Sequence, residues 1–422
     1  MAHRIFPGNL AVGLLLLLSC AGSAHSQLVT QAPVQPPLFS ALNEAFGLPI
    51  WIDDSLWDDS TADVAARLKW PNESRTDSDE SYRVYTHPGT LVLGARPFSL
   101  ALYGRDGKPS QISMVFANKG DLGQVNPFTH RLTDDYKKQI LLDARTIEQA
   151  LSKVLGAPKV DQFGQGARTR EQVDRWDWKG HSILLAAPRG EYVAVRIVPI
   201  ATLDAGAQAR ITGLDLRAKL RARVEHRPNG DVILRDMPMV DQGPKGYCVP
   251  ATWERAMRYM GIPADMYVLA MAGQTGAGGG TYVDEMAGGA KEILAANGRR
   301  LVPLGGRISP QFVAKYIDDG VPILWGMYYV LDLEQSITTR SMQRRGVTDW
   351  AAYMEMLKSS RRNAYRIRPS RENGHMCMII GYNPKTDEIA ISDSWGPQFA
   401  ERWITQEEAN AVSQDQFDVI DW

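Results

Sequence analysis

Four residues in the second half of the chain carry the functional groups of a thiol-dependent hydrolase: Gln242, Cys248, His375 and Asp393. A cysteine thiolate is a nucleophile, and an imidazole transfers protons near neutral pH. A carboxylate can hold the imidazole in one orientation, and an amide can donate a hydrogen bond to an oxyanion. This chemistry requires local elements that bring the four side chains together.

Cys248 stands at the start of a predicted helix. Pro250 fits the first turn, and the apolar residues that follow recur at helical spacing until a glycine and a proline end the pattern (Trp253, Ala256, Met257, Met260, Gly261, Pro263). Unpaired N–H groups and the positive end of the helix dipole favour an anion at a helix start. The pKa of the Cys248 thiol is therefore expected below its reference value of about 8.5.

Gln242 begins a glycine-containing turn six residues before Cys248. This turn, which runs to Gly246, can fold the amide of Gln242 back beside the sulfur atom. Gln242 and the backbone N–H of Cys248 are therefore predicted to donate into an oxyanion hole.

His375 and Asp393 fall on a predicted β-hairpin. Residues 374–382 are predicted as a strand, residues 383–387 as a turn and residues 388–393 as the returning strand. Facing residues of a hairpin have numbers that sum to about twice the turn centre, and His375 and Asp393 come within two residues of that sum. The two are predicted to be cross-strand neighbours on one face, with Asp393 holding the imidazole.

These motifs together resemble the papain-like cysteine peptidases. The Gln-Gly pair at Gln242 has the family's spacing to the cysteine, Gly374-His375 looks like its histidine strand, and Asp393 opens an Asp-Ser-Trp-Gly segment similar to its Asn-Ser-Trp-Gly motif. The chain departs from papain at Asp393, where papain has asparagine. Aspartate is the usual residue in the bacterial double-glycine leader peptidase-like branch, so the departure points toward that branch.

The resemblance covers residues 236–422 and implies an α+β fold, in which a helix carries the cysteine and an antiparallel sheet carries the histidine and aspartate. It implies hydrolysis of a peptide or protein substrate, with no metal or organic cofactor. The implied roles are oxyanion-hole donor for Gln242, nucleophile for Cys248, base and acid for His375, orienter for Asp393 and a shield over the His/Asp pair for Trp395.

Two other functions remain open. A transglutaminase-like acyltransferase shares the order Cys, His, Asp, and a peptide-binding module can keep a peptidase fold without turnover. A structural alternative is a disulfide between Cys248 and Cys377, since Cys377 lies two residues beyond His375 and faces the same side of the predicted strand.

The composition sets the broad class. The chain has 422 residues, of which 44% are hydrophobic, enough for the cores of two globular domains. A formal net charge of −1 gives no reason to expect a nucleic-acid partner. Three cysteines are too few for a disulfide scaffold.

Residues 1–26 resemble a bacterial secretion signal, because basic residues precede a short apolar run from Leu10 to Leu18. Cys20 lies in an approximate lipoprotein cleavage box, and cleavage after Ala24 or Ser26 is the alternative. The protein is expected to be exported to the periplasm or the extracellular space, with membrane attachment only through lipidation of Cys20. Residues 27–37 are predicted as a Pro/Gln-rich linker.

Residues 38–205 are predicted as an α+β domain with antiparallel strands, and residues 206–235 as a segment that connects it to the domain at 236–422. Helices are predicted at 60–70 and 134–155, and strands at 82–85, 90–93, 99–103, 111–116, 182–185 and 192–198. A faint similarity between 89–94 and 180–185 suggests an internal duplication. His87, His130 and His181 have no acidic or cysteine partner at ligand spacing, so they are not predicted to bind a metal.

Two further segments of the second domain have alternative interpretations. The glycine-rich segment 273–280 precedes a helix predicted at 282–296, but lacks the Gly-Lys-Ser/Thr of a phosphate loop, so a loop along the substrate cleft is favoured. The apolar strand 321–330 is predicted at the centre of the sheet. It is followed by an insertion, 331–374, with nine Lys/Arg and five Asp/Glu, a net charge of +4. Residues 338–369 of this insertion are interpreted as either a solvated arm or a flap over the site.

Overall fold

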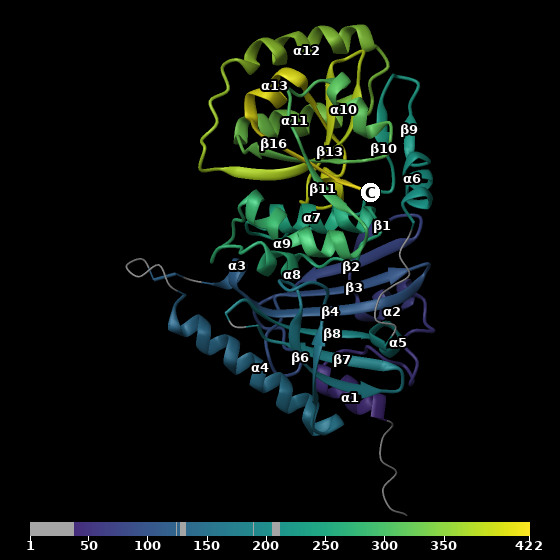
Figure 1. Ribbon diagram of the computed structural model, residues 1–422, viewed down its shortest axis with the longest axis vertical. Helices are drawn as coiled ribbons and strands as arrows, with labels where there is room; N and C mark the ends of the chain where they lie inside the picture. Colours follow the sequence, from purple (N-terminus) through teal and green to yellow (C-terminus); the bar gives the residue numbers. More distant parts are fainter. Residues whose placement is uncertain (1–37, 124, 127–131, 189, 205–211) are drawn as a thin grey trace, which may run out of the picture. The chain divides into compact units, whose positions relative to one another are not determined.

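The computed structural model describes residues 38–123, 125–126, 132–188, 190–204 and 212–422, which form two antiparallel sheets with packed helices (Figure 1). The predicted α+β class is confirmed. The predicted signal (1–26), the linker (27–37) and His130 lie outside the described residues. In the part of the chain that is described, none of the helices combines the length and apolar character needed to span a bilayer.

The first sheet has the strand order β1-β2-β3-β4-β8-β7-β6-β5. Its strands are β1 (Asn72–Arg75), β2 (Asp79–Tyr85), β3 (Ser99–Arg105), β4 (Lys108–Asn118), β5 (Lys159–Phe163), β6 (Glu171–Trp178), β7 (His181–Ala186) and β8 (Tyr192–Pro199). Its helices are α1 (Leu38–Phe46), α2 (Thr61–Leu68), α3 (Lys119–Leu122), α4 (Asp134–Leu155) and α5 (Ile200–Asp204). Two four-stranded meanders, each preceded by a helix, therefore meet at the antiparallel pair β4–β8.

The strand predicted at 90–93 is wrong. Val92 pairs only with Ala95, and the chain turns between them because Leu93 and Gly94 have φ of +52° and +77°. Val92 and Leu93 are buried in the core beside α4, so their apolar character reflects packing without strand pairing. The similarity between 89–94 and 180–185 therefore does not mark equivalent strands, although the two meanders share one topology.

The two faces of the first sheet pack against different partners. One face buries its apolar side chains against α1, α2 and α4. Within that core His181 lies among Trp51, Trp57 and Trp178, with its ring stacked on Trp178, so it is a packing residue. The other face shares a core with residues of the C-terminal half, and α7 and α8 lie between the two sheets (Figure 1).

The second sheet has the strand order β11-β16-β12-β13-β10-β9, with β14 paired to β13 and β15 paired to β14. Its strands are β9 (Val224–His226), β10 (Val232–Leu234), β11 (Arg300–Leu304), β12 (Ile323–Tyr328), β13 (Gly374–Asn383), β14 (Glu388–Ser392), β15 (Arg402–Thr405) and β16 (Ser413–Asp421). The predicted apolar strand, β12, lies inside this sheet between β16 and β13. The predicted connecting segment, 206–235, is described from residue 212 on, and this part contributes β9 and β10 to the same sheet.

The helices of this half are α6 (Gly213–Arg221), α7 (Cys248–Tyr259), α8 (Met266–Ala272), α9 (Val283–Ala296), α10 (Pro310–Ile317), α11 (Leu331–Arg344), α12 (Trp350–Ala364), α13 (Gln406–Val412) and the 3-10 turn η1 (Pro397–Phe399). Helix α7 is tied to the hairpin β13–β14: the Thr252 hydroxyl donates to Met376 O (3.1 Å), and the buried Arg255 guanidinium donates to Ser392 O (3.3 Å). These bonds bring the start of α7 beside the start of β13.

Helix α11 is not among the helices predicted from the sequence, because its sequence is polar. It is anchored by buried ion pairs: Arg340 contacts Glu408 at 2.6 Å, and Arg344 contacts Asp231 at 2.6 Å and Glu388 at 3.0 Å. The first part of the predicted arm or flap, from 338 to 344, is therefore an integral part of the domain.

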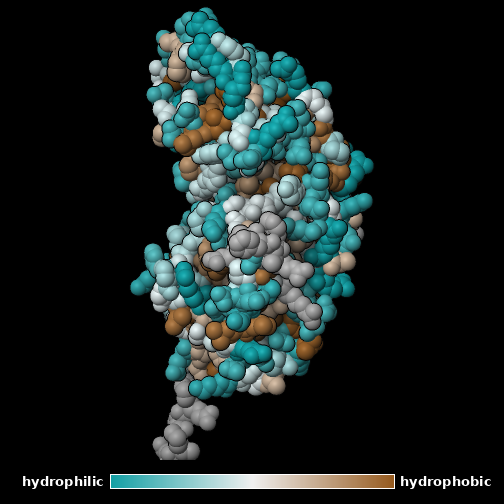
Figure 2. Space-filling view, turned by 90° about the vertical axis from the view of Figure 1, so that its left-hand side faces the viewer, coloured by the Kyte–Doolittle hydropathy of each residue, from teal (hydrophilic) through white to brown (hydrophobic). Residues whose placement is uncertain are grey.

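The molecular surface is mixed in polarity. Figure 2 shows a largely hydrophilic face with apolar side chains in separate small patches. The exposed large apolar side chains come from different elements, among them Leu142 in α4, Met342 in α11 and the loop residues Tyr282 and Tyr365.

Candidate active site

Cys248 is the first residue of α7, as predicted, and Gly261 with φ of +76° ends the helix. The N-cap residue Tyr247 makes no side-chain capping bond, so the first N–H groups are free for the sulfur. Burial acts to raise the pKa of the Cys248 thiol. The hydrogen bond to His375, the charge of His375 and hydrogen bonds from the backbone at Met376 and Val249 outweigh burial, and the pKa of Cys248 lies below its ordinary value.

His375 is the second residue of β13 and is nearly buried, with 7% of its surface exposed. Its Nε2 lies 2.8 Å from Asp393 Oδ1, which leaves Nδ1 as the ring nitrogen that can face Cys248. Burial disfavours the imidazolium, but hydrogen bonds to Asp393 and Cys248 and the charges of both groups raise the pKa of His375 to about 10. The site therefore favours a thiolate–imidazolium pair.

Asp393 makes the predicted contact with His375, but in a different register. The β13–β14 ladder pairs Met378 with Ser392 and ends there, so Asp393 follows the last ladder pair. The ladder partner of His375 is Met327, on the opposite side of β13. Continued by one pair, the ladder would set Asp393 opposite Cys377, two residues from His375. Asp393 therefore reaches the imidazole from one position beyond the end of the strand, and not as its direct cross-strand partner.

Cys377 and Cys248 are both free, so they do not form the alternative disulfide. Cys377 is fully buried on β13, and its Sγ lies 3.9 Å from Met327 Sδ. Burial raises the pKa of the Cys377 thiol well above its ordinary value. Of the two thiols, only Cys248 has the environment of a nucleophile.

Trp395 lies against His375, and Gln242 is bonded to the segment that follows Asp393. The Trp395 ring stacks on the His375 ring with centroids 4.6 Å apart, as expected of a shield. The Gln242 backbone N–H donates to Ser394 O (2.8 Å), which fixes the start of the turn next to the Asp393 segment. The Gln242 amide donates one N–H to Lys245 O (3.1 Å), and an amide nitrogen has a second N–H to offer.

Residues 234–418 match the model of the Peptidase_C39 like family. The C-terminal domain belongs to the papain-like cysteine peptidase superfamily. No curated protein matches the chain. The first sheet lies outside the matched residues. In the described residues, the peptidase domain included, there is no group of three or more His, Cys, Asp or Glu arranged to hold a metal ion.

Arg402 and Glu334 extend the site of the peptidase domain beyond the predicted residues. Arg402 Nη2 lies 2.5 Å from Asp393 Oδ2, and Arg402 Nη1 lies 2.7 Å from Glu334 Oε2. All three side chains are at most 5% exposed. Burial acts to raise the pKa of Asp393, but Arg402 and His375 outweigh it and hold the pKa below its ordinary value. Asp393 is thus a carboxylate held between two cations.

Neither residue is among the predicted site residues, for a different reason in each case. Arg402 left a weak signal, because it is the only charged residue of the short strand β15 and stands at its first position. Glu334 left none, since it lies on a helix whose sequence looks like a solvent-exposed one.

Replacing Arg402 by methionine is expected to lower the free energy of unfolding by about 3 kcal/mol, because it leaves Asp393 and Glu334 buried without their cation. Burial already raises the pKa of Glu334 above its ordinary value, and a raised folded-state pKa gives stability that is lost as pH rises. The loss in the free energy of unfolding of Arg402→Met, relative to the wild type, should therefore become smaller as pH falls. Urea unfolding at several pH values measures this loss. Arg227→Met, which breaks a half-exposed pair with Glu401 (2.7 Å), should cost under about 1 kcal/mol. Equal losses in the two variants would contradict the account.

The glycine-rich segment lies beside the turn that precedes Cys248. Gly279 bridges to Gly246, and the Gly280 N–H donates to Gly246 O (2.9 Å). The N–H groups of Gly276, Gly278 and Gly279 donate to the carbonyl oxygens of Gly280, Lys119 and Gly276. Because these donors are used within the protein, the segment does not have the free N–H groups that cradle a phosphate.

Proposed function

We propose that the peptidase domain hydrolyses peptide bonds, with Cys248 as the nucleophile. The Cys248 thiolate attacks the peptide carbonyl carbon, and the backbone N–H of Cys248 and the free N–H of Gln242 stabilise the oxyanion. The C–N bond then breaks, and the His375 imidazolium gives its proton to the leaving amine. Neutral His375 next takes a proton from water, whose oxygen attacks the acyl carbon, and the C–S bond breaks to restore the thiolate–imidazolium pair.

One observation carries this proposal: the side chains of His375 and Asp393 meet at 2.8 Å on the hairpin that α7 is bonded to, with the other ring nitrogen of His375 free for Cys248. A buried imidazole with a carboxylate on one nitrogen has its tautomer fixed, which a general base requires. The aspartate in this position supports the double-glycine leader peptidase-like branch. Export of the protein, with a peptide or protein as substrate, belongs to the same proposal.

Gln242→Ala tests the oxyanion hole. We expect kcat/KM for peptide hydrolysis to fall about 10²-fold, since one preorganised donor to the oxyanion is lost. The thiolate does not depend on that donor, so the rate of Cys248 alkylation by iodoacetamide should stay near the wild-type rate. Gln398→Ala is a matched control, because the Gln398 amide is exposed and donates to Trp395 O (3.1 Å). Unchanged hydrolysis in Gln242→Ala would remove this residue from the mechanism.

Hydrolysis of a peptide library by the purified protein, with and without a primary amine, separates the proposal from an acyltransferase. Water as the acceptor yields two free peptide termini, whereas a transferase incorporates the amine into the product. Predominant amine incorporation would overturn the assignment as a hydrolase.

A further inference from the structure

The loop from Asp241 to Tyr247 joins the two proposed oxyanion donors, Gln242 and the N–H of Cys248. Gly243 has φ of +75°, which gives the loop a conformation that few other residues adopt. Inside the loop, Lys245 O accepts both the Tyr247 N–H (2.7 Å) and the Gln242 amide (3.1 Å). A glycine-containing loop of this kind needs external contacts to keep two donors in fixed positions.

The N-terminal sheet supplies such contacts where the chain enters the loop. The Met239 N–H donates to Ser74 Oγ and the Asp241 N–H donates to Glu73 Oε1, both at 2.9 Å. The Tyr85 hydroxyl donates to Asp241 O at 2.6 Å. Strands β1 and β2 thus hold the main chain directly before Gln242.

Glu73 is itself fixed in the N-terminal domain. Its Oε1 lies 2.6 Å from Arg83 Nε, and its Oε2 accepts the Ser81 hydroxyl at 2.9 Å. The Glu73 and Arg83 side chains are each 3% exposed. Separating this ion pair would leave two buried charges without partners, which costs a large free energy. The carboxylate that accepts the Asp241 N–H therefore stays in place.

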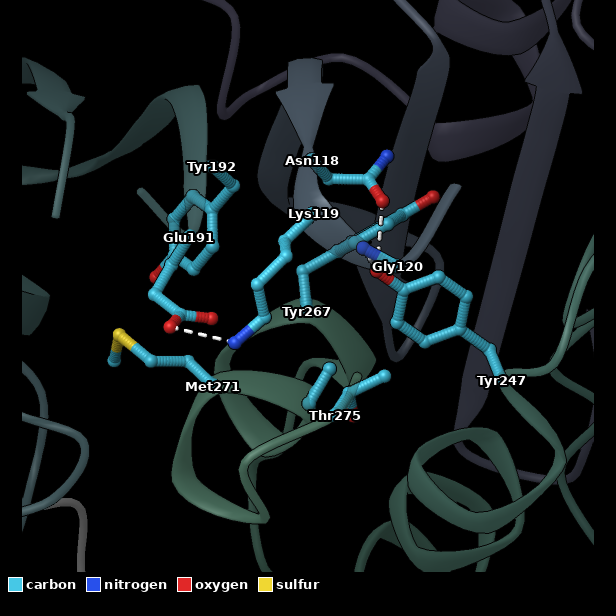
Figure 3. A pocket seen from close by; sticks show the side chains of 10 residues that line it. Asn118, Lys119, Gly120, Glu191, Tyr192, Tyr247, Tyr267, Met271 and Thr275 are labelled. Carbon is cyan, nitrogen blue, oxygen red and sulfur yellow. Dashed lines mark hydrogen bonds and ion pairs between the residues drawn. The ribbon is translucent and has the colours of Figure 1, made fainter. Parts of the chain in front are cut away.

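A second set of contacts holds the loop where it leads into α7. The Tyr247 hydroxyl donates to Asn118 Oδ1 (2.7 Å) and accepts the Gly120 N–H (3.1 Å), and Figure 3 shows the Tyr247 ring directed toward Asn118 at the end of β4. A Cβ atom at Gly120 would lie 2.3 Å from the Tyr247 hydroxyl oxygen. The two residues therefore fit closely, and Tyr247 is 2% exposed.

We infer that the N-terminal domain holds the loop 241–247 in its active conformation and is a structural part of the hydrolytic site. The inference rests on the proposed function only for its catalytic consequence. Ser74, Glu73, Tyr85 and Asn118 all lie outside the segment that matches the peptidase family. A shared apolar core, with Val240, Tyr247 and Ala251 packed on the N-terminal sheet, adds to the hydrogen bonds at both ends of the loop. These residues position the oxyanion donors and do not touch the substrate.

The double variant Tyr85→Phe/Tyr247→Phe tests the inference, because it removes both hydroxyls and keeps both rings. We expect the amides of residues 242–247 to exchange hydrogen faster, and kcat/KM for peptide hydrolysis to fall about 10²-fold, as for a small misplacement of catalytic groups. Alkylation of Cys248 should stay within about threefold of the wild-type rate, since the thiolate depends on His375.

Tyr382→Phe is the matched control: its hydroxyl donates to Asp318 (2.8 Å) near the far end of β13 from His375. This variant should match the wild type in all three measurements. Wild-type exchange of the loop amides, or wild-type hydrolysis, in the double variant would overturn the inference. If the wild-type protein does not hydrolyse peptides, the proposed function is refuted but the inference is not. The hydrogen-exchange rates of the loop amides in the wild type and the double variant would then test the inference.

Discussion

Cys248→Ala is expected to lower kcat/KM for peptide hydrolysis about 10⁵-fold, because the nucleophile is lost and only the oxyanion hole and substrate binding remain. Its Sγ lies at an uncapped helix start and accepts hydrogen bonds from the backbone, and alanine has no atom that can take its place. A steady-state assay with an excess of peptide substrate measures the loss.

Cys377→Ala is the matched control for this loss. Cys377 is also a buried free thiol and lies two residues from His375, but its raised pKa keeps it protonated. The variant removes one sulfur atom from the core and should keep most of the activity. Loss of hydrolysis in Cys377→Ala, with hydrolysis retained in Cys248→Ala, would show that Cys377 and not Cys248 is the nucleophile.

Asp393→Asn is expected to lower kcat/KM about 10⁴-fold, although papain has asparagine at the corresponding position. The carboxylate accepts from His375 on one oxygen and from Arg402 on the other. Asparagine can accept from only one of them and must direct its NH₂ group at the other. If the amide oxygen accepts from Arg402, the NH₂ group faces Nε2 of His375 and imposes the wrong tautomer.

The double variant Asp393→Asn/Arg402→Met separates this explanation from a simple loss of charge. Without Arg402 the amide oxygen is free to accept from His375, so the double variant should be at least about tenfold more active than Asp393→Asn. Activity and the free energy of unfolding are measured for both single variants and the double variant. A double variant that is no more active than Asp393→Asn would show that Arg402 does not dictate the choice of aspartate.

Much of the peptidase domain could be predicted because its signals are local. Cys248 at the helix start, Gly261 at the helix end and the turn at 383–387 depend on neighbours within a few residues, and all are present. The contact of His375 with Asp393 could be predicted because a short hairpin fixes its own register to within two residues.

The remaining features depend on contacts between distant segments. Glu334 and Arg402 are paired because α11 packs on β15, and the sequence of α11 does not indicate burial. The support that Glu73 and Asn118 give to the loop before Cys248 depends on how the N-terminal sheet packs on the peptidase domain. Such pairings leave no periodic pattern in a single sequence. The run at 90–93 shows in addition that apolar residues do not by themselves identify a strand.

The pH dependence of Cys248 alkylation by iodoacetamide, in the wild type and in His375→Ala, tests the thiolate–imidazolium pair most directly. The pKa of Cys248 is lowered mainly through His375, so the thiolate is present above that lowered pKa and is lost as pH falls through it. We expect wild-type alkylation to remain fast below the ordinary thiol pKa of about 8.5, and His375→Ala to become fast only near that pKa. A wild-type midpoint at or above the ordinary thiol pKa, unchanged by His375→Ala, would contradict the account.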